Sequence, residues 1–101
     1  MTLQTKITAT AGGGQANGFP LTKEYNIVQT VAKADDSVLL PESAPGKRVW
    51  LFNTGENALN VFTLAGGTID GQAVNEAKAL KPASMVILEG TQKENVWKSI
   101  V

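Results

Sequence analysis

The feature that most constrains the fold is the alternation of short β-forming runs with turn residues along the chain. Branched and aromatic residues gather in short runs, and Gly, Pro, Asn and Asp interrupt them at intervals of roughly 8–12 residues, a spacing typical of all-β sandwiches and barrels. No run has the length and period of a clear helix. The expected strands cover residues 25–31, 37–40, 48–52, 58–64, 85–88 and 96–101. The sequence therefore predicts an all-β fold, either a small antiparallel β-sandwich or a jelly-roll-like barrel.

One pair of expected strands carries the clearest local signal. Arg48–Phe52 and Ala58–Leu64 are both rich in β-formers, and between them lies the segment Asn53-Thr54-Gly55-Glu56-Asn57. Asn and Gly tolerate the positive φ angles that tight turns require. We therefore predict a β-hairpin over these residues.

Residues 72–81 fit two interpretations. Ala73, Ala77 and Leu80 are spaced as on one face of a helical turn, whereas residues 77–81 alone also fit a strand. Because Pro82 ends the segment and expected strands flank it, we favour a strand.

The first eighteen residues differ from the rest of the chain. Residues 2–10 alternate with period two, as in a strand or an extended arm. Residues 11–18 contain four glycines in eight residues and are expected to form a flexible joint. We therefore predict an extended N-terminal arm and joint over residues 1–18 and a β-domain over residues 19–101, with the arm packing on something other than its own core.

Composition and charge disfavour several classes of function. Nine Lys and Arg residues balance nine Asp and Glu residues, so the chain lacks the basic excess of a nucleic-acid binder. Its apolar runs are far shorter than the ~20 residues of a membrane-spanning helix, and its start lacks the apolar region of a secretory signal. We expect a soluble protein made in a cytoplasm, with no nucleic-acid or membrane partner.

The absence of histidine and cysteine limits the chemistry that this chain can perform. Histidine is the commonest general base and a favoured zinc ligand, and cysteine supplies thiolate ligands, nucleophiles and disulfides. An enzyme would have to work with carboxylates, lysines and hydroxyls alone. We therefore predict that the protein is not an enzyme and needs no cofactor.

Three local features of the sequence are candidates for a binding site. The triplet Gly12–Gly14 lacks the Lys and the following helix of a phosphate-binding loop and is expected to be a hinge. Asp70 lies in a glycine-rich loop, but a calcium loop needs several oxygen ligands and the next carboxylate is Glu76, so we expect a turn whose Asp side chain bonds nearby backbone N–H groups. Asp35 and Asp36 are expected in a solvated turn. No catalytic, cofactor-binding or metal-binding residue is predicted.

The aromatic residues give the most informative pattern. Trp50 and Phe52 fall on one side of their strand, opposite Val49 and Leu51, so both faces of that strand are apolar. Such a strand is central in a sandwich, or one of its faces meets another subunit.

Taken together, these segments resemble a group of small virion proteins of tailed bacteriophages. The shared pattern comprises AGGGQANGFPLT, the DSVLLP segment, the NTGENALNVF segment, the GGTIDG turn and the closing VWKSI, and it covers nearly the whole chain after about residue 9. The resemblance implies a β-rich homotrimer on the outer capsid surface of a virion, either a capsid decoration (cement) protein or a head-fibre or spike module. It also implies that the partner is the major capsid protein, and it brings no catalytic motif.

These considerations give a set of candidate interface residues and a hypothesis for attachment. The candidates are Leu3, Ile7, Phe19, Leu21, Tyr25, Trp50 and Phe52. The arm would lie across a neighbouring subunit by β-augmentation, with Leu3, Ile7 and Ala9 on one face. A receptor- or glycan-binding module of a fibre or spike is the main alternative, with Trp50 or Trp97 as a stacking surface for sugar rings. A tail-tube or head-completion role also fits the sequence.

Overall fold

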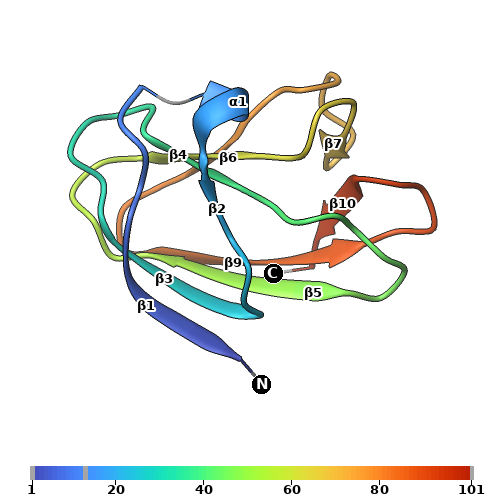
Figure 1. Cartoon of the computed structure of the whole chain (residues 1–101), viewed down its shortest axis with the longest axis horizontal. Helices are drawn as coiled ribbons and strands as arrows, with labels where there is room; N and C mark the ends of the chain where they lie inside the picture. Colours follow the sequence, from blue (N-terminus) through green and yellow to red (C-terminus); the bar gives the residue numbers. More distant parts are fainter. Residues whose placement is uncertain (1, 13, 101) are drawn as a thin grey trace.

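The computed structural model describes residues 2–12 and 14–100 and consists of two β-sheets with almost no helix (Figure 1). The six-stranded sheet has the order β1 (Leu3–Thr8), β3 (Tyr25–Thr30), β5 (Arg48–Asn53), β9 (Ser84–Gly90), β10 (Val96–Ser99), β7 (Thr68–Ile69). The four-stranded sheet has the order β2 (Phe19–Pro20), β4 (Ser37–Leu39), β6 (Leu59–Phe62), β8 (Lys78–Leu80), and one short helix, α1, covers Gly14–Asn17. The predicted all-β class is confirmed.

Between β1 and β8 the chain passes alternately from one sheet to the other and does not fold back within one sheet. From β1 to β8, odd-numbered strands join the six-stranded sheet and even-numbered strands the four-stranded sheet. Successive strands of one sheet are thus separated by an excursion through the other, and β1–β3, β3–β5, β2–β4 and β4–β6 are all parallel. Antiparallel pairing occurs at β5–β9, β9–β10 and β6–β8. The predicted antiparallel arrangement was therefore wrong, and both sheets are mixed.

The predicted hairpin over residues 48–64 was also wrong. β5 pairs with β3 and β9, whereas β6 pairs with β4 and β8, so the segment between them crosses from one sheet to the other. None of residues 53–57 has a positive φ. Instead, the Asn53 amide donates to the carbonyl oxygen of Leu80 at 2.9 Å, and the Asn57 amide donates to that of Val31 at 2.8 Å. The asparagines act here as long-range donors and not as tight-turn residues.

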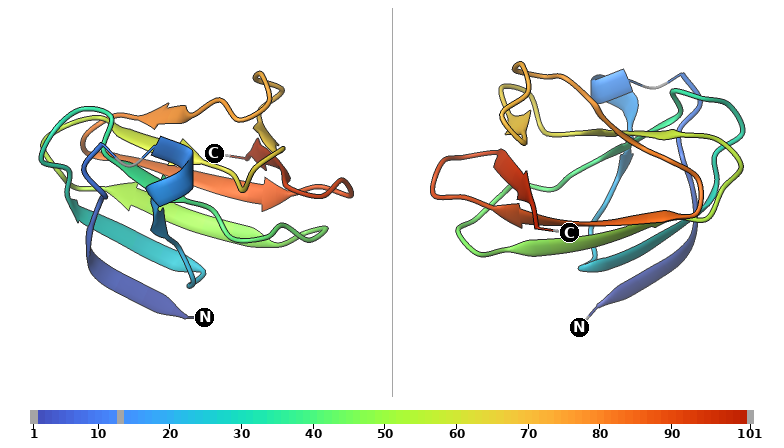
Figure 2. Two further views of the ribbon diagram at one scale, coloured as in Figure 1. Left: turned by 45° about the horizontal axis from the view of Figure 1, so that its top comes forward. Right: turned by 180° about the vertical axis from the view of Figure 1, so that it is seen from behind.

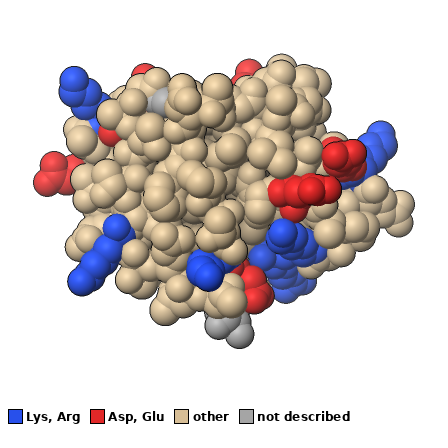
Figure 3. Space-filling model, in the orientation of Figure 1, with Lys and Arg blue, Asp and Glu red and all other residues tan. Residues whose placement is uncertain are grey.

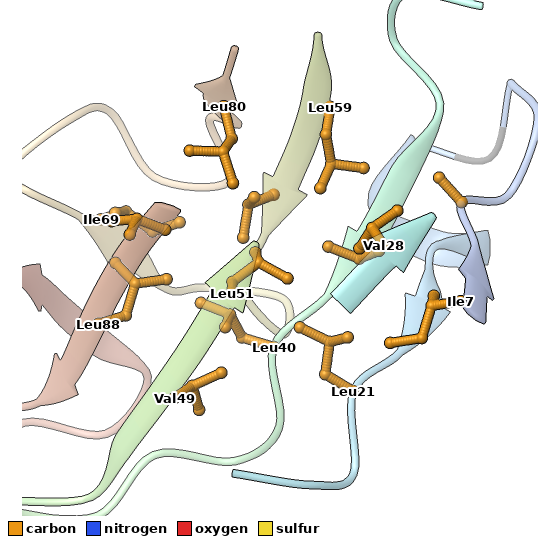
Figure 4. Close-up of a cluster of buried hydrophobic side chains, with 14 of the residues drawn as sticks. Ile7, Leu21, Val28, Leu40, Val49, Leu51, Leu59, Ile69, Leu80 and Leu88 are labelled. Atoms are coloured by element: carbon orange, nitrogen blue, oxygen red, sulfur yellow. The ribbon is translucent and has the colours of Figure 1, made fainter. Parts of the chain in front are cut away.

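The hydrophobic core fills the space between the two sheets (Figure 4). Both sheets contribute inward-facing branched side chains, such as Val28, Leu51 and Leu88 from one and Val38 and Leu59 from the other, each fully buried. Figure 2 shows the same two-layered arrangement from two further directions. This core leaves the other face of each sheet pointing outward.

The N-terminal segment is part of this body and not a free arm. β1 pairs in parallel with β3, and Ile7 and Ala9 are only 2% and 3% exposed. The glycine-rich joint contains α1, and Ser37 of β4 donates a hydrogen bond from its hydroxyl to the carbonyl oxygen of Gly14. Burial of Ile7 and Ala9 in the core explains why the segment stays on its own domain.

Two other predictions can be placed on the structure. The ambiguous segment 72–81 ends in strand β8, preceded by turns, so the preferred interpretation holds for its last part. Met1, Gly13 and Val101, which belonged to the predicted arm, hinge and last strand, lie outside the described residues.

Candidate interaction surface

The outer face of the six-stranded sheet is unusually apolar. On β5 the side chains alternate, with Val49 and Leu51 buried in the core and Trp50 and Phe52 half-buried on the opposite side. The prediction that both faces of this strand are apolar is confirmed. Because the inner side already meets the core, the outer side is available for contact.

Strand register aligns five apolar side chains in one row across this face. Leu3 pairs with Tyr25, Tyr25 with Trp50, and Trp50 with Ile87. The backbone N–H of Ile100 donates to the carbonyl oxygen of Ile87, which places Ile100 next in line. Neighbouring residues in register project from the same face of a sheet, so the row runs across four strands and ends at Ile100, the residue after β10.

A second row lies two residues along the strands. Ile27 pairs with Phe52, and Phe52 with Met85. The rings of Tyr25 and Phe52 join the two rows, with centroids 5.1 Å apart and planes inclined at 35°. We call these eight side chains the apolar rows: Leu3, Tyr25, Trp50, Ile87 and Ile100, with Ile27, Phe52 and Met85.

Charged residues close one end of the apolar rows. Arg48 and Glu89 are paired in register, and the Arg48 Nε lies 2.9 Å from a Glu89 carboxylate oxygen. Lys98 pairs with Glu89 on its other side. Both signs of charge thus lie next to one another at this end of the rows. In the view of Figure 3, which has the orientation of Figure 1, acidic and basic side chains likewise lie close to one another beside a large uncharged area.

Four of the seven predicted interface residues lie on the apolar rows: Leu3, Tyr25, Trp50 and Phe52. The other three do not. Ile7 and Leu21 are core residues, 2% and 1% exposed, and Phe19 is partly buried against the core. Ile27, Met85, Ile87 and Ile100 were missed, because sequence alternation does not reveal which strands become neighbours.

The Asp70 loop does turn the chain, as predicted, but its carboxylate acts at long range. Asp70 and Gly71 have φ angles of 54° and 73°, and the Gln72 N–H donates to the carbonyl oxygen of Ile69, as in a type I′ turn. The Asp70 carboxylate accepts hydrogen bonds from the backbone N–H and hydroxyl of Ser99, both at 2.6 Å, and from the Lys78 ammonium at 3.0 Å. The turn therefore ties strands of both sheets together.

These contacts set the ionisation of Asp70. Partial burial raises the pKa of the carboxyl, but the hydrogen bonds from Ser99 and the charge of Lys78 outweigh it, and the pKa lies below its ordinary value of 3.8. The Asp70 carboxylate is thus held ionised by structural partners, and the Lys78 ammonium is committed to an ion pair.

The remaining polar candidates lie apart from one another in the described ranges or serve structural contacts. No three acidic side chains of residues 2–12 and 14–100 gather closely enough to hold a metal ion. Asp35 lies in the predicted turn with a φ of 78°, but Asp36 is only 2% exposed and accepts a hydrogen bond from the Lys33 N–H, so that turn is less solvated than expected.

Comparison of the chain with protein-family models, with curated proteins and with solved structures gives no match. The part of the chain that the structure describes contains no helix long and apolar enough to cross a membrane.

Proposed function

We propose that this protein is a β-sandwich virion protein that decorates the outer surface of a bacteriophage capsid as a homotrimer and stabilises the head. Its partners in this proposal are further copies of itself and the major capsid protein of the same virion. The observation that carries the proposal is the set of apolar rows outside a core that is already closed. The resemblance of the sequence segments to small phage virion proteins is the reason for assigning this contact surface to a virion.

The composition of the outer face suits a protein contact. Protein interfaces are enriched in aromatic residues, Met and Arg, and this face presents Tyr25, Trp50, Phe52, Met85 and Arg48 together. A cement protein needs large, complementary contact area and no chemical step. The apolar rows outside a buried core support such a role.

One observation favours a glycan-binding module of a head fibre, tail fibre or spike as the second candidate. The rings of Tyr25, Trp50 and Phe52 are partly exposed and adjacent, and sugar rings stack on aromatic faces. Trp97, the other proposed stacking residue, is 1% exposed and has no free face. A glycan site would therefore use the same rows as the protein contact.

The test is to mix the purified protein with capsids of the phage that encodes it, prepared without this protein, and to count bound copies per particle by quantitative mass spectrometry. The decoration proposal expects saturable binding of hundreds of copies, in multiples of three, and a rise in the temperature at which the capsids break open. Binding of only a few copies, or none, contradicts it. Binding to host surface glycans by the free protein, without capsid binding, supports the second candidate instead.

A further inference from the structure

The apolar rows lie on a face that no other described element covers. In the ribbon views, no helix or strand of residues 2–12 and 14–100 crosses the outer face of β3, β5 and β9 (Figures 1 and 2). Leu3, Met85 and Ile100 remain 57%, 37% and 40% exposed. Contiguous exposed apolar surface marks a contact site in soluble proteins. We infer that this face is where copies of the chain pack against one another.

The edge strands of both sheets have features that disfavour the alternative mode of contact, in which a strand of another chain pairs with a sheet edge. β1 has register shifts around Ile7, and Lys6 has a φ of 58°. β2 and β7 have only two residues each, and β2 ends at Pro20. β8 has three residues and is followed by Lys81 and Pro82. Short strands, bulges, Lys and Pro are the devices that prevent edge-to-edge pairing. Contact through the face, and not β-augmentation, is therefore the mode that the structure favours.

Charge favours a second copy as the occupant of this face. The chain has nine basic and nine acidic residues, so two copies carry no net repulsion. The end of the face presents Arg48, Glu89 and Lys98 side by side, which suits neither a polyanion nor a strongly basic partner. In a contact with a second copy, apolar side chains meet apolar side chains, and each charged end finds both acidic and basic partners.

The size of the face shows how much of it must be covered. Five strands about 4.8 Å apart and about six residues long span roughly 24 by 20 Å, or about 480 Å² in the plane of the sheet. A standard interface covers about 800 Å² of accessible surface on each partner. Accessible surface follows the side chains and exceeds the planar area, so the whole face approaches this size. On β5 the apolar rows take two of the three outward positions, Trp50 and Phe52, and Arg48 takes the third, so a contact over the whole face includes the charged end.

This inference rests on the proposed function, in which copies of the chain must contact one another, and it assigns the surface for that contact. The test is sedimentation velocity over a concentration series. The wild-type protein is compared with the double variant Met85→Glu/Ile100→Glu and with Leu3→Glu at the opposite end of the first row. The matched control is Val74→Glu, which removes an equally exposed side chain (60%) from the segment between β7 and β8, away from this face.

We expect the wild-type protein and Val74→Glu to sediment as multiples of the 10.6 kDa chain, and the face variants to associate at least tenfold more weakly. Circular dichroism and thermal unfolding show whether each variant remains folded. If the double variant unfolds, the sedimentation of Leu3→Glu tests the same face independently. A wild-type protein that stays monomeric overturns the inference. So do face variants that assemble normally, or a control that loses assembly as they do.

Failure of this inference and failure of the proposed function are distinguishable. A protein that is monomeric in solution but binds capsids in hundreds of copies overturns self-association through this face and retains the decoration role. A protein that assembles through this face but ignores capsids retains the inference and overturns the decoration role.

Discussion

The outer faces of the two sheets differ in how much of each face is covered by other parts of the chain. On the four-stranded sheet the chain supplies part of its own cover, because α1 packs over β4 and β6. Gln15 of α1 donates to the carbonyl oxygen of Thr63, and Ser37 lies completely buried beneath the helix. The outer face of the six-stranded sheet has no such cover in the described chain and carries the apolar rows instead. Where α1 lies over β4, the strand presents a small polar residue, Ser37, to the helix. On β5, where no described element lies over the outer face, the strand presents the large side chains of Trp50 and Phe52.

The largest expected change in the free energy of unfolding comes from the inner side of the six-stranded sheet, and it is compared with the change from a residue on the outer side. Leu51 is fully buried at its centre, so Leu51→Ala is expected to lower the free energy of unfolding by about 3 kcal/mol. Ile87→Ala, on the outer row, is expected to cost only about 1–2 kcal/mol, because its side chain keeps part of its exposure. Urea unfolding at a concentration where the protein is dissociated measures both. Equal losses would mean that the outer row is packed as a second core.

The next effect concerns the link between the sheets at Asn53. This side chain is fully buried; its amide donates to the carbonyl oxygens of Asn57 and Leu80, and its oxygen accepts from the Gly55 N–H. Asn53→Ala leaves these buried groups unpaired and is expected to cost about 2 kcal/mol of unfolding free energy. Asn60→Ala is the matched control, because the Asn60 side-chain amide donates to Asp35 at an exposed position, and it should change stability by less than about 0.5 kcal/mol. A loss at Asn60 as large as that at Asn53 would contradict this account of the crossing.

A smaller loss of stability is expected where α1 is held against the four-stranded sheet. Gln15 donates to the Thr63 carbonyl oxygen and to the Asn75 side chain, both at 2.9 Å. Gln15→Ala is expected to lower the free energy of unfolding by about 1 kcal/mol and to speed hydrogen exchange in β4 and β6. Asn17→Ala, at the exposed end of the same helix, is the control and should leave exchange in those strands unchanged. Unchanged exchange in Gln15→Ala would mean that the cover does not depend on this tie.

The smallest expected effect is a dependence of stability on pH. It arises from the contacts of the Asp70 carboxylate with Ser99 and Lys78, which lie on neither outer face. Because the pKa of Asp70 is below 3.8 in the folded protein, the carboxylate stabilises the fold above pH 3.8. That stability is lost as the pH falls through the lowered pKa. Asp70→Asn should therefore unfold at a lower temperature than wild type at neutral pH, with the gap narrowing below pH 3.8. Glu94→Gln, which removes the same charge from an exposed turn, should show no narrowing, and a constant gap for Asp70→Asn would contradict the assignment.

The sequence predicts which residues share a face of a strand, but not which strands lie together. Period-two alternation correctly placed Trp50 and Phe52 opposite Val49 and Leu51, since it is a property of the strand itself. The order of strands depends on long-range pairing, so the missing row members Ile27 and Ile87 could not be assigned. The same limit explains the false hairpin, because Asn53 and Asn57 have the composition of a local turn but bond to distant carbonyls. The arm was misjudged for a related reason, since alternation does not show whether Ile7 meets its own core or another subunit.

The central claim is that a second copy covers the outer face of the six-stranded sheet, and the two tryptophans allow a direct test in the unmodified protein. Trp97 is 1% exposed in the core, whereas Trp50 lies half-buried on the apolar rows, so iodide quenching of tryptophan emission reports mainly on Trp50. The account predicts that the quenchable fraction falls as the protein concentration rises through the range in which the sedimenting mass increases. A quenchable fraction that stays constant while the mass increases would contradict it, because association would then leave this face open.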